Sequence, residues 1–311
     1  MRILMRRVRS TASAGISGFF APHIASDLRE TGAVGGGLGV AKAIVVEVSV
    51  DLSHSDGLVV VNRINGSYID GCLARYIAER IFAVAGRKGG RVYIDQRISV
   101  PIGGGYGSSG GSAVAIAFAL AKALDIPIDF DDVAEIAHEA DIVCKSGLGT
   151  VVGVLKPCDG IVLVSKPGGP RIAEVRCIPM EPNLIALTAF YRPIPKNSIL
   201  SSPNHLEKVR AIGLETLKKI EASPTPENFI RSCYQFALET GFLTPKIRQV
   251  IELLQEVDGV IGASMNMVGE ALFAIVNDYA VDKALEIIEK TNPVWVYRWR
   301  PGVNSVQVEE L

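Results

Sequence analysis

The sequence predicts an α+β protein built from two domains, and three observations support this. The chain has 311 residues, a length typical of two domains or one large one, and 48% of them are hydrophobic, which is ample for a buried core. Strand and helix patterns are mixed in both halves, and the strands have the potential to pair antiparallel. Met180-Glu-Pro182 interrupts the pattern as a linker would. We therefore expect one domain at residues 1–180 and a second at 181–311.

The first half is expected to alternate strands and helices. β-branched and apolar runs predict strands at residues 7–14, 40–50, 58–62 and 91–100, and short strands at 150–155, 160–165 and 172–178. Apolar residues at helical spacing predict helices at 69–85, 108–124 and 131–145. Glycine-containing stretches at 15–23 and 32–39 are predicted to be turns, with close approach to a substrate as the alternative at the second.

The second half is expected to carry helices between two groups of strands. Strands are predicted at 184–191, 260–265, 271–276 and 294–299. Three helices are predicted within 204–257 and another at 281–290.

The stretch Pro101–Ser112 has six glycines and three serines, and the apolar helix predicted at 108–124 begins within it. Glycine permits positive φ and lets a ligand approach the main chain closely. The start of a helix presents unpaired N–H groups and the positive end of the helix dipole. Loop and helix start together therefore predict an anion site, most often for phosphate.

Three interpretations of this loop follow from the residues alone. Gly105-Tyr-Gly-Ser-Ser-Gly110 fits a dinucleotide fingerprint, but the strand before it alternates polar and apolar residues, unlike a buried parallel strand. A Walker A loop needs a lysine before the helix, and none occurs until Lys122. A purely structural helix entry would use fewer glycines, because glycine is costly to order.

The stretch Pro101-x-x-x-Gly-Tyr-Gly-Ser-Ser-Gly-Gly111 resembles the Pro-x-x-x-Gly-Leu-Gly-Ser-Ser-Ala-Ala motif of the GHMP kinase superfamily, which includes galactokinase, homoserine kinase and mevalonate kinase. Tyr106 stands in place of leucine, and two glycines replace the alanines. The resemblance implies an N-terminal domain like ribosomal protein S5 domain 2 and a ferredoxin-like C-terminal domain. Four further segments are similar to the archaeal pantoate kinases of that superfamily: Gly15–Phe20, Thr31–Gly37, Gly147–Val151 and Ser264–Phe273.

The resemblance assigns the loop to the phosphates of ATP and to Mg²⁺. The phosphate-binding residues would be Gly103, Gly104, Gly105, Gly107, Ser108, Ser109, Gly110 and Gly111. The metal would be held by Ser109, with Ser108 as the alternative, and by the carboxylate of Glu139; Glu135, one helical turn earlier, is the alternative acid. In the alternative, purely structural interpretation, the serines cap the helix and the glutamates are ordinary solvent-exposed helix residues.

The catalytic aspartate of the superfamily is expected at the fourth residue of Gly147-Leu-Gly-Thr150, where this chain has threonine. Threonine is no general base at neutral pH, whereas phosphoryl transfer depends chiefly on positioning and charge neutralisation. Asp141 and His138 are candidates for the general base, and Lys145 is a candidate to neutralise phosphate charge. In the alternative interpretation each of the three is an ordinary helix residue.

A small hydroxy-acid substrate needs a cation or a group of N–H donors for its carboxylate. The candidates are Gly36 and Gly37, in the 35–37 turn, and Arg63, Arg192 and Lys196. Phe19, Phe20 and His23 are candidates for an apolar wall, or belong to the core.

Net charge, hydropathy and cysteine content argue against several other classes of protein. A formal net charge of −1 argues against nucleic-acid binding, and no stretch is long and apolar enough to span a membrane. The five cysteines are scattered without metal-ligand spacing. We expect them to be reduced and mostly buried in a cytoplasmic protein, in neither a zinc site nor a disulfide framework.

The resemblance implies an ATP-dependent kinase that phosphorylates pantoate to 4-phosphopantoate on the archaeal route to coenzyme A. We expect a homodimer. The alternatives are another GHMP kinase, acting on homoserine or mevalonate, and a non-catalytic protein of this fold that binds a ligand.

Overall fold

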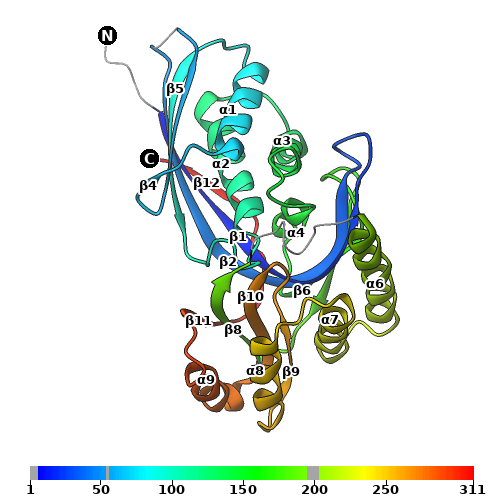
Figure 1. The fold of residues 1–311 in the computed structure, drawn as a ribbon. Helices are drawn as coiled ribbons and strands as arrows, with labels where there is room; N and C mark the ends of the chain where they lie inside the picture. The colour runs from blue at the N-terminus through cyan, green and yellow to red at the C-terminus, as the bar shows by residue number, and fades with distance from the viewer. Residues whose placement is uncertain (1–5, 54–55, 195–202) are drawn as a thin grey trace.

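The computed structural model describes residues 6–53, 56–194 and 203–311. The chain forms two sheets with helices packed against them (Figure 1). The first sheet is built on a long antiparallel hairpin of β1 (Arg6–His23) and β2 (Gly32–Asp51). Its strand order is β12-β1-β2-β5-β3-β4, from β3 (Leu58–Ile64), β4 (Ser67–Tyr68), β5 (Gly90–Ile98) and β12 (Gln307–Glu310).

The predicted turns at 15–23 and 32–39 are wrong, because both stretches lie within β1 and β2. There the other edge of β2 pairs with β6 (Gly160–Lys166), and β6 pairs with β7 (Glu174–Pro179). The glycines permit close contact instead of a turn. A Cβ at Gly37 would lie 1.8 Å from the Ile16 carbonyl oxygen, and one at Gly36 would lie 2.9 Å from the Phe19 ring.

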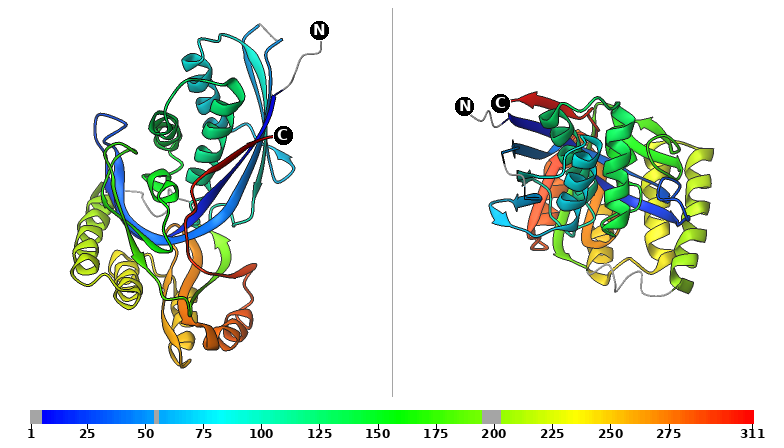
Figure 2. Two further views of the ribbon diagram at one scale, coloured as in Figure 1. Left: turned by 180° about the vertical axis from the view of Figure 1, so that it is seen from behind. Right: turned by 90° about the horizontal axis from the view of Figure 1, so that it is seen from above.

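Three helices cover one face of the first sheet: α1 (Cys72–Val84), α2 (Ser108–Leu124) and α3 (Phe130–Val143) (Figures 1 and 2). α2 packs against β1, β2 and both other helices, and it is buried along most of its length, as its alanine-rich sequence requires. The strand predicted at 150–155 is wrong, because these residues form the helix α4 (Thr150–Leu155). A short buried apolar run has no periodicity that distinguishes a strand from a helix.

The second sheet has the order β11-β8-β10-β9, and every pairing in it is antiparallel. Along the chain it runs β8 (Leu184–Pro193), the helices α6 (Pro203–Ala222), α7 (Pro226–Thr240) and α8 (Pro245–Gln255), then β9 (Val260–Met265), β10 (Gly269–Asn277), α9 (Val281–Glu289) and β11 (Trp295–Trp299). This is the β-α-β-β-α-β order of the ferredoxin-like fold, so the expected α+β fold class is confirmed. After β11 the chain returns to the first sheet, where β12 pairs with β1 (Figure 1).

The expectation that the cysteines are reduced is wrong for two pairs. Cys72 is bonded to Cys144 and Cys158 to Cys177, with Cα atoms 5.7 and 5.5 Å apart. The sequence separations are 72 and 19, so only the fold brings each pair within the distance that a disulfide requires. Cys233 is a buried thiol, and burial raises its pKa well above the usual value. Within the described ranges, no helix is long and apolar enough to cross a membrane.

Candidate active site

The glycine-rich loop joins β5 to α2, where the sequence places it. Gly103, Gly105 and Gly107 have φ of 77°, 79° and 60°, which side chains rarely tolerate. Gly107 is the N-cap of α2 and no side chain caps the helix, so the serines that follow it do not serve as caps. The first helix amides therefore face the loop with their N–H groups available, which is the arrangement predicted for an anion site.

Contacts on two sides fix the shape of the loop. From β1, the Gly15 N–H donates to the Tyr106 carbonyl at 3.0 Å. From the turn between β9 and β10, the Asn266 side-chain amide donates to the Gly104 carbonyl at 3.3 Å. A Cβ at Gly105 would lie 2.2 Å from the Met267 carbonyl oxygen, so glycine is required at this contact. Asn266 and Met267, both within the segment Ser264–Phe273, thus contact the loop, one through its side-chain amide and the other through its main-chain carbonyl.

Tyr106 anchors the loop to the second sheet. Its side chain is 1% exposed, and its hydroxyl bonds to the Thr188 hydroxyl at 2.8 Å. Thr188 donates onward to the Leu272 carbonyl at 2.6 Å, and the Trp295 ring packs edge-on against the tyrosine. Burial raises the pKa of the phenol. The sequence shows that tyrosine replaces leucine but does not show this anchoring role. The only local sign of it is the tyrosine hydroxyl, which needs a hydrogen-bond partner when the ring is buried.

Ser109 links the loop to the turn after α3. Its hydroxyl donates to the Ser146 carbonyl at 3.2 Å. The Ser146 hydroxyl in turn donates to the Asp141 carboxylate at 2.7 Å, and Asp141 is fully buried. A Cβ at Gly147 would lie 2.2 Å from the same carboxylate. Within the described residues Ser108 makes no side-chain hydrogen bond, so its half-buried hydroxyl is available at the helix start.

Thr150 lies against the start of α2. A Cβ at Gly110 would lie 2.7 Å from the Thr150 Cβ, and one at Gly107 would lie 2.8 Å from its methyl group. The residue at the expected aspartate position is therefore beside the glycine loop. It carries no carboxylate, so it contributes packing and a hydroxyl there.

Glu139 points toward α1. Its carboxylate pairs with the Arg80 guanidinium at 3.1 Å and accepts a hydrogen bond from the Tyr76 hydroxyl at 3.3 Å. Among the described residues no hydrogen bond or ion pair joins Glu139 to the glycine loop. The structure thus does not bring Glu139 and Ser109 together by direct contact, whereas it connects Asp141 to Ser109 through Ser146.

Glu135 and His138 lie on α3 beneath neighbouring loops. Glu135 is 8% exposed, and it accepts a hydrogen bond from the Arg171 N–H at 3.2 Å. Desolvation by burial raises its pKa. His138 is fully buried, and its Nε2 contacts the carbonyls of Leu28 and Thr31 at 3.2 and 3.0 Å. A ring nitrogen that donates to main-chain carbonyls holds the β1–β2 connection, a structural role that leaves it poorly suited as the base.

The predicted substrate cations have partners of their own. Arg63 pairs with Asp95 on the neighbouring strand, and Arg192 pairs with Glu270. Lys196 lies outside the described residues. Lys145 is exposed at the turn after α3, with φ of 53°, and has no ion pair within the described part of the chain.

The glycines and aromatic residues predicted for the substrate lie within the sheet and its core. The strand segment that contains Gly36 and Gly37 is paired on both edges, so the expected turn with free N–H groups is not present. Phe19 is fully buried against Phe229, and Phe20 stacks on Phe242. For these two residues the structure favours the core interpretation.

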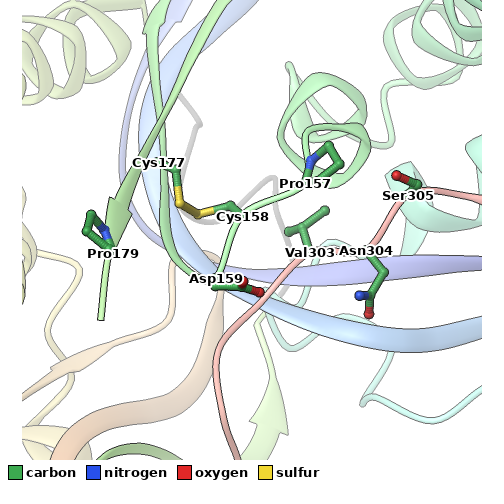
Figure 3. A pocket seen from close by; sticks show the side chains of 8 residues that line it. All are labelled: Pro157, Cys158, Asp159, Cys177, Pro179, Val303, Asn304 and Ser305. Carbon is green, nitrogen blue, oxygen red and sulfur yellow. A yellow bond between two sulfur atoms is a disulfide. The ribbon is translucent and has the colours of Figure 1, made fainter. Parts of the chain in front are cut away.

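Figure 3 shows a surface hollow of about 540 Å³ elsewhere in the molecule, lined by Pro157, Cys158, Asp159, Cys177, Pro179, Val303, Asn304 and Ser305. None of the predicted site residues that the structure describes lines it. Among the described side chains no group of three or more His, Cys, Asp or Glu residues is arranged to hold a metal ion.

Two family profiles match the chain. Residues 67–153 match the GHMP kinases N terminal domain, and residues 217–294 match the GHMP kinases C terminal domain. Together they account for more than half of the sequence. The chain belongs to the GHMP kinases. The first match contains the glycine loop, Ser109, Asp141 and Thr150, so the geometry described above lies within the family's N-terminal domain.

Individual relatives match over nearly the whole chain of this GHMP kinase. A pantoate kinase of Methanocaldococcus jannaschii is 27% identical over 91% of the chain and 97% of its own length. A pantoate kinase of Thermococcus kodakarensis is 28% identical over 95% and 98%. A solved structure described as a phosphotransferase related to the CoA biosynthesis pathway has a TM-score of 0.86 at 25% identity, covering 97% of this chain and 98% of that one. A homoserine kinase from Cytophaga hutchinsonii, at a TM-score of 0.72, 16% identity and 99% coverage of both chains, shares the fold.

Proposed function

We propose that this protein is an ATP-dependent kinase that phosphorylates the primary hydroxyl of pantoate to give 4-phosphopantoate, a step toward coenzyme A. The observation that carries the proposal is the likeness to pantoate kinases along nearly the whole chain, which reaches 28% identity over 95% of it. The glycine loop, Ser109 and the turn after α3 supply the anion site that a kinase requires.

The start of α2 fits the triphosphate of ATP. The first helical hydrogen bond is donated by the Gly111 N–H to the Gly107 carbonyl, so the amides of residues 108–110 remain for a ligand. The positive end of the helix dipole favours the negative charge of phosphate. The phosphates would be held by the eight loop residues that the sequence indicates: Gly103, Gly104, Gly105, Gly107, Ser108, Ser109, Gly110 and Gly111.

The donor set beside this loop also fits Mg²⁺, which prefers oxygen ligands. A serine hydroxyl, from Ser109 or Ser108, and one carboxylate of α3 would hold the ion. Glu139 is the acid suggested by the sequence; Asp141 is favoured by its link through Ser146 to Ser109, since Glu139 is engaged by Arg80. When bound, the ion would neutralise charge on the phosphates.

The chain's own residues act mainly by positioning and charge. Thr150 packs against Gly107 and Gly110 at the place where the superfamily has its aspartate, and it takes up no proton at neutral pH. Phosphoryl transfer through a loose transition state requires little help from a base. Lys145, exposed at the turn next to Ser146, is the cation suited to the charge of the transferring group.

Transfer of radiolabelled phosphate from ATP, measured with pantoate, homoserine and mevalonate in parallel, tests the proposal. Labelled 4-phosphopantoate as the main product supports it. Preferential labelling of homoserine or mevalonate would change the proposed substrate but support the proposed kinase activity. Nucleotide binding without transfer to any acceptor would favour a non-catalytic protein, the candidate that Thr150 keeps open.

Three finer expectations remain predictions. The first is a domain boundary near residue 180, the second a cytoplasmic location, and the third a homodimer. Sedimentation of the purified protein checks the third directly.

A further inference from the structure

The disulfide between Cys72 and Cys144 joins the two ends of the segment that contains the glycine loop, α2 and α3. Cys72 is the first residue of α1, and Cys144 is the C-cap of α3. The cysteines are 72 positions apart, and the glycine loop, α2 and α3 all lie between them. The bond therefore closes this segment at the end of α3, next to the turn that Ser109 contacts.

The cross-link is two residues away from the carbonyl that accepts the Ser109 hydrogen bond. Cys144 leads into Lys145, whose φ of 53° lies in the left-handed region that residues other than glycine rarely adopt. Ser146 follows, with its carbonyl 3.2 Å from the Ser109 hydroxyl and its own hydroxyl 2.7 Å from the Asp141 carboxylate. A strained turn persists only when its surroundings hold it. The bond at Cys144 is such a restraint.

The side-chain hydrogen bond and the ion pair described above between α1 and α3 lie further from this turn. Glu139 receives hydrogen bonds or ion pairs from Tyr76 and Arg80, and these fix the middle of α3. They lie more than one helical turn before Cys144. The C-cap residue of α3 is thus held against the first residue of α1 by the covalent bond.

We propose that the Cys72–Cys144 disulfide is a positioning element that keeps the turn at residues 144–147 in place for Ser109, so that reducing it slows phosphoryl transfer. The inference rests on the proposed kinase function. Cys72 is exposed and Cys144 half-buried, so a small dithiol reaches the bond.

The reduction is an ordinary thiol–disulfide exchange with a dithiol. A thiolate of the reductant attacks the Cys72 sulfur, the S–S bond breaks, and Cys144 leaves as a thiolate that takes up a proton. The second thiolate of the reductant then displaces Cys72, which also takes up a proton. Two electrons have passed to the protein, and the reductant leaves as a cyclic disulfide.

The test compares two double variants prepared under oxidising conditions. Cys72→Ser with Cys144→Ser removes the proposed element. Cys158→Ser with Cys177→Ser is the matched control, because it removes the other disulfide, which lies by the hollow of Figure 3. We expect the first variant to lose about tenfold in kcat and to be insensitive to dithiothreitol. Wild type and control should lose the same factor when dithiothreitol is added.

A double-mutant cycle separates positioning from general stability. In a Ser109→Ala background, removing the Cys72–Cys144 bond should change kcat by less than about twofold, because the contact that it positions is already absent. The inference is overturned if the loss in kcat from Ser109→Ala and the loss from removing the disulfide multiply in full when the changes are combined. It is also overturned if wild type keeps its kcat while mass spectrometry shows both thiols free.

A readout without turnover distinguishes failure of this inference from failure of the proposed function. If no form phosphorylates any acceptor, the proposed function fails. Hydrogen exchange of the amides at residues 144–149 then decides the inference: reduction should speed exchange in wild type and control, and leave the Cys72→Ser, Cys144→Ser variant unchanged. Unchanged exchange in reduced wild type would reject the positioning role.

Discussion

The Ser109 hydroxyl donates to the Ser146 main-chain carbonyl at 3.2 Å, so one side chain joins the start of α2 to the turn after α3. The Ser146 hydroxyl continues the connection to the buried Asp141 carboxylate at 2.7 Å. The start of α2, a serine hydroxyl and an acid are thereby held in one network.

Replacing Ser109 by alanine should lower kcat by about 10- to 100-fold while leaving the unfolding midpoint nearly unchanged, because misplacement of a phosphate or metal contact by about 1 Å costs on this scale. Ser112→Ala is the matched control. The Ser112 hydroxyl is buried on the same helix and has no hydrogen-bond partner among the residues that the structure describes, so its removal should be neutral or slightly stabilising. Equal turnover in both variants would remove Ser109 from the site.

Asp141→Asn and Glu139→Gln should differ in their requirement for Mg²⁺. Both substitutions keep shape and remove a charge. If Asp141 supplies the metal-binding carboxylate, its amide variant should need about tenfold more Mg²⁺ for half-maximal activity, which corresponds to about 1.4 kcal/mol. Glu139→Gln should mainly weaken the contact with Arg80. Titration of activity with Mg²⁺ measures both, and the opposite order would return the assignment to Glu139.

Replacing Lys145 by glycine separates the effect of backbone strain on stability from the effect of the lysine charge on catalysis. Its φ of 53° costs a non-glycine residue about 1–2 kcal/mol, so Lys145→Gly should raise the free energy of unfolding by up to about 1 kcal/mol once the entropy of glycine is counted. The same variant should lower kcat, because it removes the cation proposed to face the phosphoryl group. Urea unfolding and initial rates measure the two effects. A variant that is more stable and fully active would show that the charge has no role.

Tyr106→Phe should lower the free energy of unfolding by about 1 kcal/mol, since it removes the hydroxyl that bonds to Thr188 in a buried site. Tyr279→Phe is the control, because Tyr279 is 67% exposed and its hydroxyl can bond to water. Denaturant unfolding of the two variants measures the difference. No difference between them would show that the buried hydroxyl bond does not help to hold the loop.

Glu135 should make stability depend on pH. Burial raises the pKa of Glu135 in the folded protein above its usual value of 4.5, so between the unfolded and folded pKa values the native state binds more protons. Stability from this group is present below the unfolded pKa and is lost as the pH rises through the folded pKa. Glu135→Gln should abolish that loss. The difference in urea midpoint between wild type and variant, measured from pH 4 to 7, should grow with pH; a constant difference would contradict the shift.

Much of the fold could be predicted because its signals are local. Helix α2 begins at Ser108 and ends at Leu124 as expected, since a left-handed glycine precedes it and one apolar run fills it. The glycines of β1 and β2 gave the wrong answer because their neighbours are distant in sequence: Gly36 faces Phe229 of α7. The disulfides were missed for the same reason.

The candidate site divides in the same way. The glycine loop and its serines form a continuous motif, so they could be found from the residues. The acid could not be chosen, because Glu139 and Asp141 lie on different faces of α3 and the sequence does not tell which face turns toward Ser146. The anchoring of Tyr106 required the second sheet, which is built from residues far along the chain.

The pairing of β12 with β1 means that the first sheet can be completed only late in translation. Ser10 of β1 lies opposite Val308 of β12, so one edge of the first sheet stays open until nearly 300 further residues have left the ribosome. An open edge strand is a template for pairing with other chains. The nascent protein therefore exposes β1 throughout elongation, and chaperone binding or misassembly during translation should be concentrated at that strand.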